Sequence, residues 1–70
     1  MTIEEITAAI RRQTYGLLND GEVVYATELA LTAHGGIDPD DVTDVDVVFG
    51  KSSMDIQLMM REQPLVIDLA

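Results

Sequence analysis

The sequence predicts a two-layer α+β domain in which two N-terminal helices pack on a C-terminal three-stranded antiparallel meander. Three observations lead to this prediction. Apolar residues recur at helical spacing near the start of the 70-residue chain, they alternate with polar residues near its end, and 47% of all residues are apolar, which is enough for one compact core. We therefore expect a single domain over residues 1–70.

The first helix is expected over about residues 2–18. Thr2 followed by Glu5 is a capping-box pattern, in which two residues satisfy each other's free amides at a helix start. An apolar face then repeats at helical spacing, formed by Ile3, Ile6, Ala9, Ile10 and Leu17, with Gln13 on the same face. Gly16 weakens the last turn, and Asn19-Asp20-Gly21 ends the helix.

The stretch from 22 to 34 has features of both a helix and a strand. Its Ala, Leu and Glu content and the Gly35-Gly36 pair that follows favour a helix. An alternation typical of a strand is also present, at Val23, Tyr25, Thr27, Leu29 and Leu31. We favour the helix, which would place His34 near the negative helix end in a structural role. Tyr15 and Tyr25 are expected to be half-buried packing residues.

The last third of the chain predicts a short helical turn and then three strands. Asp38 is the expected N-cap of the turn, with Pro39 at its first position. Alternating runs follow at about residues 44–49, 54–60 and 65–69. If both connections form hairpins, the facing pairs are Phe49 with Met54, Val47 with Ile56, Val45 with Leu58, Met60 with Leu65, Leu58 with Ile67 and Ile56 with Leu69. This pairing places every large apolar side chain on one face, with the run 54–60 in the centre.

Thirteen acidic residues against four basic ones give the chain a net charge of −9. Such a field attracts basic protein surfaces and repels nucleic acid and anionic membranes. No apolar run is long enough to span a bilayer, and the first residues lack the basic segment of a secretory signal. We therefore expect a cytoplasmic protein that binds neither membrane nor nucleic acid directly.

The other face of the predicted sheet is acidic. It would carry Asp44, Asp46, Val48, Asp55, Gln57, Met59, Val66 and Asp68, and the preceding segment adds Asp38, Asp40 and Asp41. Neither set contains a cation, whereas a solvated surface normally mixes both signs. Two interpretations remain open: acidity that serves solubility or reflects a host with acidic proteins, and a surface that binds a basic partner.

The leading functional hypothesis is a small non-enzymatic protein–protein interaction module. Carboxylates along strands can replace DNA phosphates opposite lysine and arginine, so a nucleic-acid-mimicking inhibitor that docks on a nucleic-acid-handling protein is one form of it. The predicted partner-binding residues are Asp38, Asp40, Asp41, Asp44, Asp46, Asp55, Gln57, Met59 and Asp68. The alternative is a structural or assembly subunit or a homo-oligomer that associates through Val48, Met59 and Val66 or through the edge strands.

Residues 28–45 suggest a third function. Glu28-Leu29-Ala30 followed by Gly36-Ile37-Asp38-Pro39-Asp40-Asp41-Val42 resembles the second helix, turn and third helix of helix-turn-helix regulators. With the hairpin that follows, the order of elements resembles a winged-helix domain. The third helix implied by this resemblance would present four aspartates to DNA, where cationic contacts are required: Asp40, Asp41, Asp44 and Asp46. Such a scaffold would therefore serve protein binding.

No catalytic, cofactor or metal site is predicted. Cysteine is absent, which excludes disulfides and thiolate metal sites, and His34 is the one histidine. Gly50-Lys51-Ser52 lacks the earlier glycine and the following helix of a phosphate-binding loop. The aspartates at 38, 40 and 44 lack the glycine and the bidentate glutamate of a calcium loop.

Overall fold

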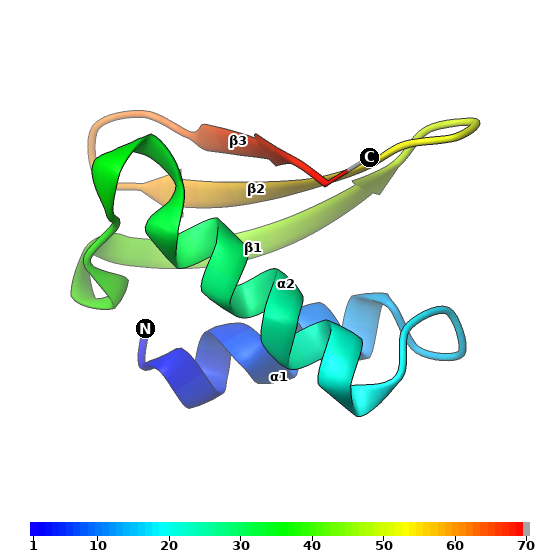
Figure 1. The fold of residues 1–70 in the computed structure, drawn as a ribbon. Helices are drawn as coiled ribbons and strands as arrows, with labels where there is room; N and C mark the ends of the chain where they lie inside the picture. The colour runs from blue at the N-terminus through cyan, green and yellow to red at the C-terminus, as the bar shows by residue number, and fades with distance from the viewer. Residues whose placement is uncertain (70) are drawn as a thin grey trace.

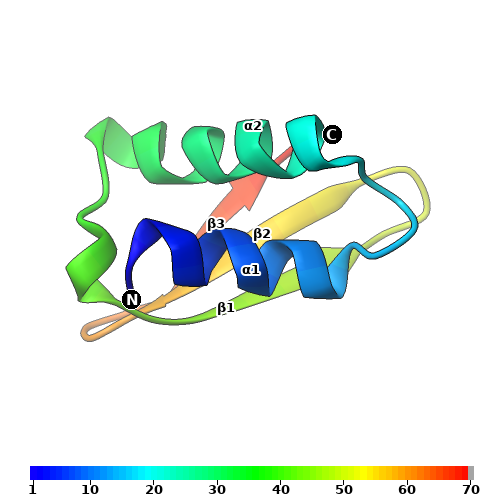
Figure 2. The same ribbon diagram turned by 90° about the horizontal axis from the view of Figure 1, so that it is seen from below.

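Two helices cover one face of a three-stranded antiparallel sheet in the computed structural model, which describes residues 1–69 (Figure 1). The elements follow in the order α1 (Ile3–Gln13), α2 (Asp20–Thr32), β1 (Val42–Phe49), β2 (Met54–Met60) and β3 (Leu65–Asp68). The predicted two-layer α+β architecture, with helices first and the meander last, is confirmed. Figure 2, seen from the helical side, shows α1 and α2 running antiparallel in front of the sheet.

The start of α1 follows the prediction, but its end comes earlier. The Glu5 amide donates to Thr2 Oγ1 (3.1 Å), and the Thr2 amide donates to Glu5 Oε1 (2.8 Å), which completes the capping box. The helix ends at Gln13 rather than at residue 18, and Gly16 then adopts a φ of 80°, which favours glycine. Leu17, expected on the buried face, is consequently 65% exposed.

The helix expected over 22–34 is confirmed and begins slightly earlier, because a second capping box precedes it. The Glu22 amide donates to Asn19 Oδ1 (2.8 Å), and the Asn19 amide donates to Glu22 Oε1 (3.0 Å). After Thr32 the chain turns through Ala33–Gly35, where His34 has a left-handed φ of 55°. The Nε2 atom of His34 lies 3.3 Å from the Val66 carbonyl oxygen, so the imidazole meets β3.

The short helical turn predicted after Asp38 is confirmed, whereas the third helix implied by the resemblance to helix-turn-helix regulators is not formed. Pro39–Asp41 forms one 3-10 turn, and β1 begins directly after it at Val42. Asp38 caps this turn as expected, since its Oδ1 accepts from the Asp40 amide at 3.0 Å. The chain forms no recognition helix here because the alternating apolar and polar residues after the turn favour a strand.

The sheet has the order β1-β2-β3, and its first hairpin has the predicted register. Val45 lies opposite Leu58, and Val47 lies opposite Ile56. The predicted register of the second hairpin is wrong by two residues, because Leu58 pairs with Leu65 and Ile56 with Ile67. An even shift keeps the same side chains on each face, so the alternation of residues cannot distinguish the two registers.

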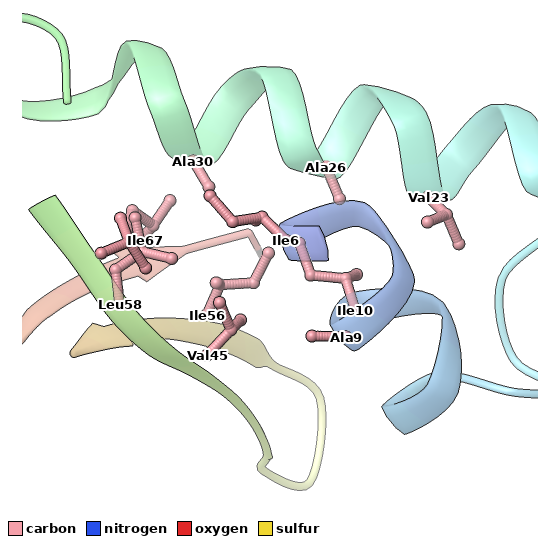
Figure 3. Close-up of a cluster of buried hydrophobic side chains, with 11 residues drawn as sticks. Ile6, Ala9, Ile10, Val23, Ala26, Ala30, Val45, Ile56, Leu58 and Ile67 are labelled. Atoms are coloured by element: carbon pink, nitrogen blue, oxygen red, sulfur yellow. The ribbon is translucent and has the colours of Figure 1, made fainter. Parts of the chain in front are cut away.

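The core lies between the helices and the sheet (Figure 3). Its buried apolar residues are Ile6, Ala9 and Ile10 of α1, Val23, Ala26 and Ala30 of α2, and Val42, Val45, Ile56, Leu58 and Ile67 of the sheet. α1 packs on β1, whereas α2 packs chiefly against α1. The expected half-burial of the tyrosines is wrong, because Tyr15 follows the end of α1 and is 89% exposed, and Tyr25 is 62% exposed. Within residues 1–69, no helix has the length and apolar character needed to cross a bilayer.

Candidate partner-binding surface

The sheet face opposite the helices carries the predicted acidic cluster. Alternate strand residues such as Val45, Ile56 and Ile67 are buried under the helices, so their neighbours point the other way. We call this surface the outer face. Its residues are Asp44, Asp46, Val48, Asp55, Gln57, Met59, Val66 and Asp68.

The register brings the outer-face residues together in rows across the strands. One row holds Val48, Asp55 and Asp68, and the next holds Asp46, Gln57 and Val66. Asp44 lies opposite Met59. Directly opposed residues have Cβ atoms about 5 Å apart, so the carboxylates of Asp55 and Asp68 are close neighbours of like charge.

The outer-face carboxylates differ in burial and in hydrogen bonding. Asp46 and Asp68 are exposed, and so is Asp44, whose Oδ1 accepts from the Val45 amide at 2.8 Å. Asp55 is half-buried, and its Oδ1 is shielded from solvent without a hydrogen-bond partner. Gln57 and Met59 are half-buried on the same face as these aspartates.

Three of the outer-face carboxylates have no ion pair with a described lysine or arginine. No described cation forms an ion pair with Asp44, Asp46 or Asp55. Arg11 instead pairs with Asp20 on the helical side of the molecule, with 3.3 Å between Nε and Oδ1. The outer face is therefore a surface of negative potential on which the local self-repulsion of three carboxylates is not offset by a described ion pair.

The other predicted site residues lie at one end of the sheet. Asp38, Asp40 and Asp41 are exposed in the turn that leads into β1. Asp41 also lines a shallow hollow with Met60, Arg61 and Glu62, so a cation lies close to this turn. Figure 2 shows the turn at the opposite end of the sheet from the β1–β2 connection. The structure thus divides the predicted residues into the outer face and a separate acidic turn.

Gln13 has a role that the sequence did not reveal. Its Nε2 donates to the Val45 carbonyl oxygen, and its Oε1 accepts from the Val47 amide, both at 2.8 Å. The side chain thereby occupies the free edge of β1 as a neighbouring strand would. The available signal was a polar residue within the apolar stripe of the first helix, where an unpaired amide would be costly.

The described residues give no indication of a metal site, and comparisons with other proteins add no relative. Within residues 1–69, no three His, Asp or Glu side chains come together in a way that could hold a metal ion. Comparison with protein-family models, with curated proteins and with solved structures finds no match to this chain.

Proposed function

We propose that this protein is a non-enzymatic protein–protein interaction module that docks its outer face on a basic surface of a partner protein. One observation carries the proposal: four aspartates share the sheet face that the helices leave open, and Asp44, Asp46 and Asp55 have no ion pair with a described cation. Lysine and arginine of a partner would relieve the repulsion among these carboxylates on binding. Attraction at long range would also speed encounter.

The spacing of the carboxylates supports joint action on one partner. Residues two apart on a strand are separated by about 7 Å, and adjacent strands by about 5 Å. Both distances are shorter than the Debye length of about 8 Å at physiological salt, so the aspartates act as one charged surface. Val48 and Val66, which are 43% and 48% exposed, add apolar contact between the charges.

The more specific form of the proposal is an inhibitor that mimics nucleic acid. A protein that binds phosphate groups presents clustered lysine and arginine, and rows of carboxylates on a sheet are complementary to such a cluster. The partner would then be a nucleic-acid-handling protein, and added DNA would compete with this chain for it.

The test compares two double variants with the same change in net charge. Asp44→Lys with Asp46→Lys reverses the outer face, and Glu28→Lys with Glu62→Lys reverses exposed charges elsewhere. A partner is first captured from the native host and purified, and its affinity is then measured by calorimetry. We expect the outer-face variant to bind at least about tenfold more weakly than the natural chain, because like charges now meet. The affinity of the matched control should change little.

The result that contradicts the proposal is equally specific. If the outer-face variant binds the purified partner as tightly as the natural chain at low and moderate salt, the outer face is not the docking surface. If DNA fails to displace the chain while the outer-face variant still loses affinity, the interaction module stands and the nucleic-acid mimic is wrong.

The assembly alternative has less support from the described contacts. Gln13 occupies the edge of β1, which removes part of the backbone that a second copy would pair with. Light scattering in moderate salt distinguishes the two functions, since the interaction module is expected as a monomer and the assembly subunit as an oligomer.

A further inference from the structure

α2 has a second apolar stripe that the core does not use. Its buried side is formed by Val23, Ala26, Thr27 and Ala30. On an adjoining flank, Tyr25 and Leu29 follow the spacing of one helix face, next to Glu22 and to Ala26, which the core also buries. Tyr25 and Leu29 are 62% and 37% exposed, although their side chains are large and mostly apolar. A helix with apolar residues on two sides normally has a neighbour on both.

The second stripe borders a hollow at one end of the molecule, which we call the apolar hollow. Leu18 from the α1–α2 connection, Met54 at the start of β2 and Leu69 after β3 complete its lining. In Figure 1, α2 is inclined to the sheet, and its N-terminal end lies farther from the strands than its C-terminal end. The hollow has a volume of about 190 Å³. Cavities of about 150 Å³ hold a benzene ring, so one large apolar side chain can enter it.

The charges around the apolar hollow select the kind of partner. Glu22 is the one charged residue in the described lining, and the whole chain carries −9. One of the two arginines at the end of α1, Arg11, is paired with Asp20. A second copy of the chain would bring a like charge of equal size, whereas a basic segment would be attracted.

We infer that the apolar hollow binds a segment of a partner protein in which a large aliphatic or aromatic side chain is flanked by lysine or arginine. The apolar side chain enters between α2 and the sheet, and the cation lies opposite Glu22. None of these residues belongs to the outer face, so the inference stands or falls separately from the proposed function.

The test is a selection of random dodecapeptides against the full chain, with counter-selection against the Leu29→Ser variant. Enriched peptides are expected to combine a large apolar residue with a neighbouring lysine or arginine. An enriched peptide is then titrated by fluorescence anisotropy. We expect Leu29→Ser and Tyr25→Ser each to weaken its binding about tenfold, because each removes part of the apolar lining.

Two further variants separate the apolar and charge contributions. Val24→Ser changes an exposed residue of α2 that does not line the hollow, and it should leave binding unchanged. Glu22→Gln retains a side chain that can complete the capping box but removes the charge. It should weaken binding about threefold in about 0.1 M NaCl and have little effect in about 1 M NaCl, where the Debye length is about 3 Å.

Four outcomes overturn the inference. One is a selection that enriches no peptide over the Leu29→Ser variant. A second is an enriched set without basic residues, and a third is an enriched peptide that binds the Leu29→Ser and Tyr25→Ser variants as tightly as the natural chain. The fourth is self-association of the natural chain that Leu29→Ser abolishes, because a second copy would then fill the hollow. Amide NMR spectra establish that each variant is folded before its affinity is compared.

Discussion

The side chain of Gln13 joins the two layers of the fold. It lies at the end of α1, where the apolar stripe of that helix meets the sheet, and both halves of its amide bond the backbone of β1. A hydrogen-bonded amide at this position satisfies edge groups that would otherwise need water or another strand. One polar residue thus stabilises the fold and limits strand pairing with other molecules.

The replacement Gln13→Ala is expected to lower the free energy of unfolding by about 1–2 kcal/mol, because two hydrogen bonds to β1 are lost. Gln13→Glu should have an intermediate effect, since a carboxylate can accept from the Val47 amide but cannot donate to the Val45 carbonyl. Urea denaturation followed by circular dichroism measures both changes. Arg12→Ala, at an exposed neighbouring position, is the control and should change stability by less than about 0.5 kcal/mol. A Gln13→Ala variant as stable as this control would contradict the assigned role.

At the scale of elements, the two helices show which features of a sequence determine a helix and which do not. Both helices start where a capping box is formed, and the box at Thr2 was visible in the sequence. α2 was ambiguous because it is apolar on two sides, so its residues also satisfy the alternation of a strand. The apolar residues that border the hollow cause this ambiguity, because a helix with one apolar face would have shown a clear helical period.

The capping box of α1 predicts a pH dependence. The hydrogen bond from the Thr2 backbone amide, and then that from the Thr2 hydroxyl, lower the pKa of the Glu5 carboxyl. A carboxyl with a lowered pKa stabilises the folded state above its unfolded pKa, and this contribution is lost as the pH falls through the folded pKa. Thr2→Pro removes both donors while suiting the φ of −76° at this position. We expect the pKa of Glu5 to rise in this variant, as measured by NMR titration of its side-chain carbonyl carbon. An unchanged titration would show that the capping box does not form in solution.

At the scale of the whole molecule, repulsion among the charges that give a net −9 lowers the stability of the folded state, and several of these charges lie together on the outer face. Asp55 and Asp68 are opposed across β2 and β3, and like charges in directly opposed positions are unfavourable by a few tenths of a kcal/mol. Surfaces that bind a charged partner are commonly less stable than they could be, because their charges are arranged for the complex.

Salt is therefore expected to stabilise this protein. Raising NaCl from about 0.05 M to about 0.5 M should increase the free energy of unfolding in urea by about 0.5–1 kcal/mol, because screening reduces the self-repulsion. The Asp44→Lys, Asp46→Lys variant should gain less, since its outer face is closer to neutral. A stability that falls with salt would mean that attractive pairs such as Arg11 with Asp20 dominate instead.

The sequence by itself determined the class of the fold, the order of its elements and the face on which each strand residue lies. Capping residues and the period of apolar residues are local properties, and they suffice for these features. For the same reason the composition of the outer face was predictable, because a period of two assigns Asp44, Asp46, Asp55 and Asp68 to one side.

Only the tertiary structure decided the features that depend on distance between elements. These are the register of the second hairpin, the separation of the turn at 38–41 from the outer face, the hydrogen bonds of Gln13 to β1 and the apolar hollow beside α2. Registers that differ by two residues satisfy the same alternation, and a hollow depends on the angle at which a helix lies over a sheet. Packing selects among such alternatives, since it sums contacts between residues that are far apart in the chain.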